Sequence, residues 1–239
     1  MERRDLKVFG SADNTGGVYR DISIMGSGDI NGDVECRSYK VMGSGDLDGN
    51  LKSEIIKITG SGNIDGDVYG IDVLINGSGD ITGNIKCSTL KIAGSSDIGG
   101  NIEGIEVGIY GSCDVDGNCE CEMFNGKGAF TIGGELIADE VNIEVIRDCE
   151  VGSIGAGRVV VRGAGTEGFK SLAFFKGKGS RKFECDVIEG DEIYLEKTEV
   201  NTIRGKNIVI GPGCEIESIE YSDELEIHKE SQVDHIIKL

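Results

Sequence analysis

The stretch that decides the fold is residues 25–109, which reads MGSGDINGDVECRSYKV, MGSGDLDGNLKSEIIKI, TGSGNIDGDVYGIDVLI, NGSGDITGNIKCSTLKI, AGSSDIGGNIEGIEVGI. One phrase, seventeen letters long, is written five times without a gap. Numbered from the residue before the first glycine, positions two and eight are glycine in every copy. Glycine beside Asp or Asn is typical of turns, because glycine tolerates positive φ and short polar side chains bond the local backbone. A fixed period of this kind predicts a repeat architecture.

Apolar residues are as regular as the glycines. They occupy positions six and ten and then recur as a pair at fifteen and seventeen, which in the fourth copy are Ile81, Ile85, Leu90 and Ile92. Spacing of two and β-branched side chains predict short strands. Position twelve holds only small residues, such as Cys36, and is expected to face inward at a crowded corner. Because one copy cannot bury its own apolar side but stacked copies can, the sequence predicts an all-β, single-stranded parallel β-helix with three sides.

The coil arithmetic predicts one continuous β-helix over residues 1–239, with about thirteen coils and a length of roughly 60 Å at about 4.8 Å per coil. The regular coils cover residues 9–143, and C-terminal coils cover residues 186–239. Between them, the stretch 162–195 has twice the length of the repeated phrase and is therefore expected to form two coils.

Residues 163–185 break the pattern and read GAGTEGFKSLAFFKGKGSRKFEC. Their apolar residues are out of phase with the coil, and they form the one basic cluster of an acidic sequence. We expect an irregular basic and aromatic protrusion. As a hypothesis it is a docking element for a partner, for the acidic face of another copy or for a membrane surface, and it uses Lys170, Phe174, Phe175, Lys176, Lys178, Arg181 and Lys182.

Charge disfavours some partners. The chain has 43 acidic and 24 basic residues and a net charge of −19. Nucleic acid is not expected as a partner because phosphate contacts need clustered Lys and Arg. The net negative charge also disfavours adsorption to anionic lipid, although it does not exclude membrane association. No apolar run is long enough to span a membrane. The stretch MERRDLKVFG has two arginines but no apolar segment after them, so it is not expected to be a secretory signal, and a cytoplasmic location is predicted. The eight cysteines are then expected to be free thiols that fill the core.

Enzyme motifs are missing. The sequence has neither a G-x-S-x-G motif nor a P-loop lysine motif. Its two histidines, His228 and His235, could serve as general bases but are expected to cap the last coil. The run VIGPGCEI (209–216) faintly resembles the repeat of hexapeptide acyltransferases. We predict no enzyme activity, no cofactor, and neither catalytic nor metal-binding residues. A Ca²⁺ ladder on the stacked aspartates of position five is the alternative that remains open.

With its repeated G-S-G-D-I-x-G-(D/N)-(V/I) phrase, the sequence resembles the bactofilins, the polymer-forming cytoskeletal proteins of bacteria, and most of all a long Gram-positive type. The resemblance covers at least residues 9–143. It implies a right-handed β-helix, end-to-end polymerisation without nucleotide, and roles in cell shape or in positioning other proteins. Bactofilins usually have about half as many coils and disordered tails, and this chain departs from them in both respects.

The chain ends carry apolar residues that could serve assembly. An open strand edge recruits another strand unless it is blocked. The hypothesis is an interface formed by Leu6, Val8, Phe9, Ile236, Ile237 and Leu239. The predicted function is therefore a non-enzymatic scaffold whose partners are copies of itself and other cytoskeletal or cell-envelope proteins. The alternative is a non-polymerising adaptor rod that binds a partner through residues 163–185.

Overall fold

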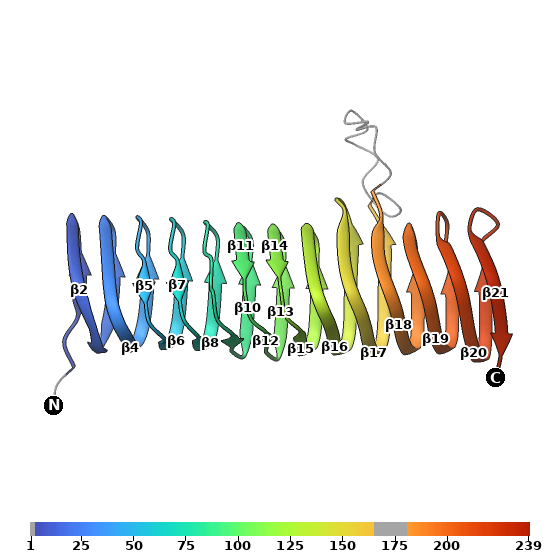
Figure 1. The fold of residues 1–239 in the computed structure, drawn as a ribbon, viewed down its shortest axis with the longest axis horizontal. Helices are drawn as coiled ribbons and strands as arrows, with labels where there is room; N and C mark the ends of the chain where they lie inside the picture. Colours follow the sequence, from blue (N-terminus) through green and yellow to red (C-terminus); the bar gives the residue numbers. More distant parts are fainter. Residues whose placement is uncertain (1–2, 165–180) are drawn as a thin grey trace.

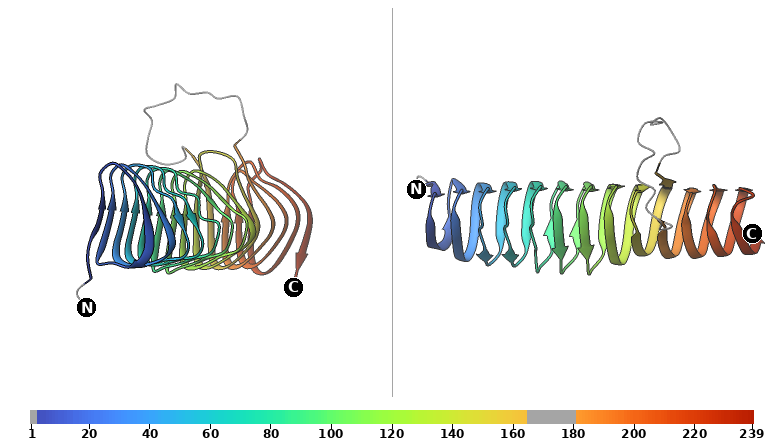
Figure 2. Two further views of the ribbon diagram at one scale, coloured as in Figure 1. Left: turned by 60° about the vertical axis from the view of Figure 1, so that its left-hand side comes forward. Right: turned by 90° about the horizontal axis from the view of Figure 1, so that it is seen from above.

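The computed structural model describes residues 3–164 and 181–239, and it is a straight rod in which one parallel sheet winds through about 13 turns (Figure 1). Strand partners lie one coil apart, as in the row in which Ile30 pairs with Leu47 and Leu47 with Ile64. No residue of the two described ranges is helical. The predicted all-β parallel solenoid is confirmed, and the termini lie at opposite ends of the rod (Figure 2).

The strands of the regular region are short where glycine turns interrupt them. They are β1 (Leu6–Val8), β2 (Ser11–Val18), β3 (Asp21–Ile24), β4 (Ser27–Val41), β5 (Leu47–Asp48), β6 (Leu51–Ile58), β7 (Ile64–Asp65), β8 (Val68–Ile75), β9 (Ile85–Lys86), β10 (Thr89–Ile92), β11 (Ser95–Ile98), β12 (Ile102–Glu103), β13 (Glu106–Ile109) and β14 (Ser112–Val115).

Later strands are longer and bend around the corners. They are β15 (Cys119–Gly126), β16 (Ala129–Val145), β17 (Cys149–Gly163), β18 (Phe183–Leu195), β19 (Thr198–Ile210), β20 (Glu215–Ile227) and β21 (Gln232–Lys238).

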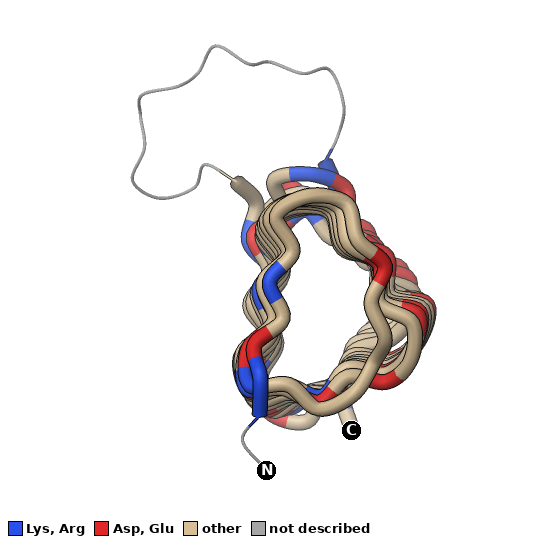
Figure 3. The backbone as a smooth tube through the Cα atoms, turned by 90° about the vertical axis from the view of Figure 1, so that its left-hand side faces the viewer, with Lys and Arg blue, Asp and Glu red and all other residues tan. Residues whose placement is uncertain are grey.

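Each coil between residues 25 and 143 points three pairs of residues into the rod. The pairs stand at positions four and six, ten and twelve, and fifteen and seventeen, and in the fourth copy all six are buried: Gly79, Ile81, Ile85, Cys87, Leu90 and Ile92. Viewed along the rod, the coils superpose, so that like residues stack in columns (Figure 3). The inward position twelve is confirmed. Position four also faces inward, as Ser96 and Cys113 do, and the sequence analysis did not predict this.

The glycines of position two are needed for close stacking. A Cβ atom on Gly60 would lie 1.9 Å from the carbonyl oxygen of Gly43, and the other position-two glycines from Gly26 to Gly128 meet the coil before them in the same way. Positive φ occurs only at Gly17, Gly32, Gly49 and Gly213 among the described glycines. The expectation of positive φ beside Asp and Asn is therefore wrong for position four and holds at position eight only for Gly32 and Gly49. At position two, the missing side chain lets one coil approach the next.

Position nine carries a ladder of side-chain hydrogen bonds. Oδ1 of Asn84 accepts from the backbone N–H of Asn101 at 2.9 Å, and Oδ1 of Asn101 accepts from the N–H of Asn118 at 2.8 Å. The same contact begins at Asp33 and ends on Glu135. Each side chain thus bonds the turn of the next coil, whose N–H would otherwise lack a partner in the sheet.

Two aromatic rings repair the first break in the aliphatic pattern. Position seventeen of the coil that begins at Tyr110 is Gly126, and its missing side chain is replaced by the Phe130 ring, 2.7 Å from where a Cβ would stand. Phe124 and Phe130 are buried, with ring centroids 5.7 Å apart in an edge-to-face arrangement. The core therefore continues without a gap where the sequence pattern fades.

The register corrects one predicted boundary. Val161 pairs directly with Leu195, so residues 162–195 supply one coil step and not the two that their length suggested. Phe183 and Cys185 belong to β18 and pair with Cys149 and Val151. The irregular segment predicted for residues 163–185 therefore ends before Phe183. Most of that segment lies outside the described residues.

Candidate functional site

The C-terminal end of the rod presents an uncovered slice of the core. Val233 lies over Ile216 and Ile236 over Ile219, each one coil further along an inward column. Within the described chain, β21 pairs with β20 on one side and with no strand on its outer side. Ile236 is 50% exposed, whereas Ile219, which Ile236 of the next coil covers, is fully buried.

The predicted assembly residues at this end divide into two kinds. Ile236 belongs to the inward column, while Ile237 pairs with Glu220 in an outward column and Leu239 lies beyond β21. Sequence reasoning missed three further members of the open slice, Leu225, Ile227 and Val233. Their signal was available, because each stands one repeat period after a buried isoleucine of the preceding coil.

The N-terminal end is partly closed by its own side chains. Leu6 and Val8 stack on Ile22 and Ile24, and Val8 is buried, whereas Phe9 is 70% exposed. Tyr19 is buried at this end, where its hydroxyl donates to the carbonyl of Thr15 at 2.7 Å. The predicted residues of this end therefore serve different roles: Leu6 and Val8 extend the core, and Phe9 points to solvent.

The two ends differ in charge. Residues 3–20 contain four basic residues and two acidic ones. Residues 215–239 contain eight acidic residues and two lysines. Unlike ends therefore attract each other, while two C-terminal ends repel, and both effects weaken with salt.

The basic docking cluster is only partly described. Lys170, Phe174, Phe175, Lys176 and Lys178 lie outside the described residues. Arg181 is exposed at the start of the second described range. Lys182 is held by Glu215 and Glu199, with Nζ 3.0 Å from a carboxylate oxygen of each, and these contacts raise the pKa of its ammonium group. Lys182 thus joins three coils and is not a free docking residue.

A groove of about 590 Å³ runs along one side of the rod. Its floor is a row of outward residues on neighbouring coils, in which Asn125 pairs with Asn142, Asn142 with Val160, and Val160 with Tyr194. Lys91 and Gly108 precede Asn125 in the same row. The groove exists because short side chains occupy the row between Lys91 and Tyr194.

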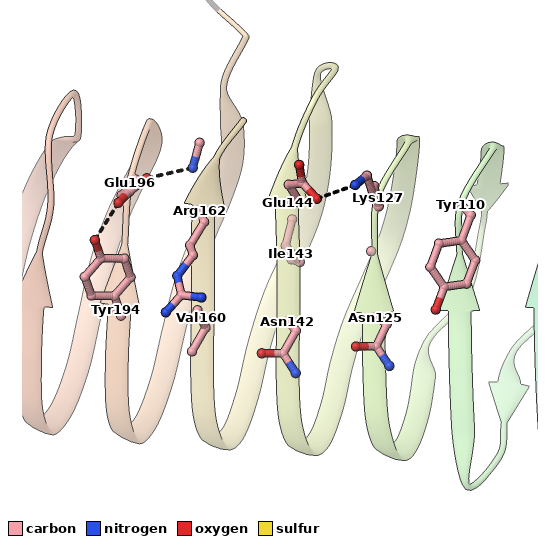
Figure 4. Close-up of a pocket in the computed structure, with 12 residues that line it drawn as sticks. Tyr110, Asn125, Lys127, Asn142, Ile143, Glu144, Val160, Arg162, Tyr194 and Glu196 are labelled. Atoms are coloured by element: carbon pink, nitrogen blue, oxygen red, sulfur yellow. Dashed lines mark hydrogen bonds and ion pairs between the residues drawn. The ribbon is translucent and has the colours of Figure 1, made fainter. Parts of the chain in front are cut away.

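A second row forms the rim of the groove and consists of Tyr110, Lys127, Glu144, Arg162 and Glu196 (Figure 4). Nζ of Lys127 lies 2.6 Å from Oε2 of Glu144. The guanidinium carbon of Arg162 lies 5.6 Å from the centre of the Tyr194 ring. The rim therefore begins at Tyr110 and continues with charged groups of alternating sign, and the Tyr194 ring lies beside its far end.

Both tyrosines are held in place. An added Cβ on Gly108 would stand 2.6 Å from the Tyr110 ring, so that ring lies back over the glycine, and Nζ of Lys91 is 5.0 Å from its centre. At the other end, the Tyr194 hydroxyl donates to Oε1 of the buried Glu196 at 2.5 Å, and Oε2 of Glu196 accepts from the backbone N–H of Gly163 at 2.9 Å. The hydrogen bond to Glu196 raises the pKa of Tyr194 to about 12.

Groups for catalysis or metal binding are not gathered in the part of the chain that the structure describes. Within it there is no cluster of three or more His, Cys, Asp and Glu that could hold a metal ion. All eight cysteines are free and buried. Burial raises the pKa of the Cys87 and Cys113 thiols to about 12, so these thiols are poor nucleophiles at neutral pH. His228 accepts a hydrogen bond from the N–H of Glu230 at 3.2 Å in the turn before β21.

No protein-family model matches the chain. No solved structure matches it. Two uncharacterized proteins of Bacillus subtilis (strain 168) are similar over short stretches. YhbF is 46% identical over 70 residues, which are 29% of this chain and 30% of YhbF, and YhbE is 40% identical over 55 residues, which are 23% of each protein. The chain thus matches less than a third of the length of either relative.

Within residues 3–164 and 181–239, no helix is long and apolar enough to cross a membrane.

Proposed function

We propose that the chain is a non-enzymatic scaffold whose rods join end to end into filaments without nucleotide. The observation that carries the proposal is the open slice at the C-terminal end, made by Leu225, Ile227, Val233 and Ile236. These side chains continue the inward columns of the core, and burying them against another rod removes apolar surface from water.

The backbone supports the same proposal. β21 has one edge toward β20 and one edge without a strand among the described residues. A free edge of this kind presents unpaired N–H and C=O groups that favour pairing with another chain. The opposite charges of the two ends favour contact between an N-terminal and a C-terminal end, an arrangement that repeats without closing and extends into a filament.

The location and the cellular role are parts of the proposal. A cytoplasmic filament of this kind would help to shape the cell or position other proteins, as the resemblance to bactofilins implies. Its partners would be further copies of the chain and other cytoskeletal or cell-envelope proteins.

Negative-stain electron microscopy and sedimentation velocity of the untagged full chain, without nucleotide and at two salt concentrations, test the proposal. We expect filaments from the wild type. Ile236→Asp places a charge in the open slice and should yield discrete rods. The matched control is Ile55→Asp, because Ile55 is an exposed isoleucine on the side of the rod, and it should still form filaments.

Discrete wild-type rods at high protein concentration would overturn the proposal. They would favour the adaptor rod instead, in which residues 163–185 contact a partner. Filaments that survive Ile236→Asp would place the interface elsewhere on the molecule.

A further inference from the structure

The groove between Tyr110 and Tyr194 has no part in joining rod ends, because it lies on the side of the rod across β15, β16, β17 and β18. We propose that this groove binds a neutral, linear and extended oligosaccharide. The proposal does not depend on filament formation, since a single rod and a filament present the same groove.

The Tyr110 ring forms a flat apolar platform. Gly108 has no side chain, which leaves room for the ring to lie over the backbone of the preceding residues, and Tyr110 is 41% exposed. The close-up shows the ring with its face turned outward from the ribbon (Figure 4). A sugar ring has an apolar face of C–H groups that packs on an aromatic surface of this kind.

The floor beside the platform is polar and unlike a site for an apolar helix. The amides of Asn125 and Asn142 lie side by side on neighbouring coils, so each can offer an N–H donor and a C=O acceptor to a ligand. The amide of Asn142 also donates to Glu140 at 3.2 Å, which fixes its orientation. Hydroxyl groups, which donate and accept, match such amides, whereas an apolar helix face would leave them unpaired.

The far end of the groove is built from buried polar contacts. Only 5% of the surface of Glu196 is exposed, and its carboxylate fixes Tyr194 through the hydroxyl. Arg162 lies against the same ring. This wall is preorganised, so a ligand would lose little affinity to ordering of the protein.

The shape and charge of the groove decide the class of ligand. Gly108 and Tyr194 are four coil steps apart in one straight row, roughly 19 Å at the usual strand spacing, so the ligand must be extended and several sugar rings long. The groove carries Lys127 and Arg162 as well as Glu144 and Glu196, so its own charges balance, and the net charge of −19 on the whole chain disfavours a polyanion. A neutral and extended glycan satisfies both conditions.

Isothermal titration calorimetry of the full chain with three tetrasaccharides tests the proposal. Cellotetraose and chitotetraose are extended, whereas maltotetraose is curved and serves as the shape control. We expect binding of at least one extended glycan and none of maltotetraose or glucose. Since the chain has no tryptophan, tyrosine fluorescence provides a second readout of the same event.

Three variants locate the binding. Tyr110→Ala removes the platform and should weaken binding roughly tenfold. Gly108→Ala keeps the tyrosine but lifts its ring, since the three atoms nearest to the added Cβ all belong to the Tyr110 side chain, and it should weaken binding by a similar factor. Tyr69→Ala removes an exposed tyrosine outside the groove and should leave binding unchanged.

Circular dichroism of each variant establishes that the rod is intact. The proposal is overturned if neither extended glycan binds the wild type, or if binding is the same in Tyr110→Ala and Gly108→Ala as in the wild type. It is also overturned if the groove binds an unstructured peptide competitor and neither of the two extended glycans.

Discussion

Gly60 lies over Gly43 so closely that a Cβ atom on Gly60 would stand 1.9 Å from the Gly43 carbonyl oxygen. The contact involves backbone and cannot be relieved by turning a side chain. Gly60→Ala should therefore separate two coils and lower the free energy of unfolding by about 3 kcal/mol. Urea denaturation followed by circular dichroism measures the change.

The control for this substitution is Gly10→Ala. A Cβ on Gly10 would meet no atom within 4 Å, so this variant should unfold at the wild-type urea concentration. Equal destabilisation by both substitutions would show that loss of glycine itself, and not the close approach of coils, is responsible.

The ladder of position nine predicts a difference between two replacements of Asn101. Its Oδ1 accepts from the N–H of Asn118 at 2.8 Å. Asn101→Ala leaves that donor without its partner and should cost about 1 kcal/mol of stability. Asn101→Asp keeps an acceptor and should retain most of the wild-type stability. Thermal denaturation of the two variants at neutral pH separates these outcomes, and equal losses would contradict the ladder.

The stacked carboxylates of position five predict that the stability of the fold depends on pH. Desolvation, followed by the neighbouring Asp80 and Asp114, raises the pKa of Asp97 above its usual 3.8. The folded state therefore binds the proton of Asp97 more tightly than the unfolded state, and ionisation of Asp97 opposes folding above that pKa. Asp97→Asn should raise the melting temperature at pH 7, and the gain should vanish as the pH falls below about 3.8.

The reciprocal variant is Asn63→Asp, which adds a carboxylate between Asp46 and Asp80 in the same stack. It should lower the melting temperature at pH 7, with a smaller effect in high salt. A gain from Asp97→Asn that persists unchanged at pH 3 would indicate a cause other than charge.

The cysteines predict slow thiol chemistry. All eight are buried, and burial raises the pKa of most of them, including Cys185 to about 12. With Ellman's reagent at pH 7.5, the native protein should show no fast phase, and all eight thiols should react in guanidinium chloride. Ser95→Cys, at an exposed outward position, should add one fast-reacting thiol. A fast phase in the wild type would contradict the buried positions.

The columns of the core could be predicted from the sequence because their period is strict. Ile81, Ile85, Leu90 and Ile92 face inward as the spacing indicated. Position four was missed because glycine carries no side chain to show its direction, and only Ser96 and Cys113 hinted that the position is inward. The register after Val161 was misjudged because the stretch 162–195 fits two coils by length and one coil by pairing.

The candidate sites could be predicted less well. Ile236 was chosen for its place near the chain end, whereas Leu225 and Val233 were missed because the repeat period was not followed into the last coil. The groove was missed because it is formed by short side chains between longer ones. Gly108 and Asn125 carry no motif, and they form a floor only once strand register places them in one row with Tyr194.

Because every coil adds about the same rise, each rod has a fixed length. If rods join at their ends, each adds roughly 60 Å, and the groove recurs along the filament at that interval. A long polymeric ligand would then contact many copies at once, so weak single contacts would combine into tight attachment, while a short fragment of the same ligand would dissociate freely. Such an array would respond to the length of its ligand as well as to its chemistry.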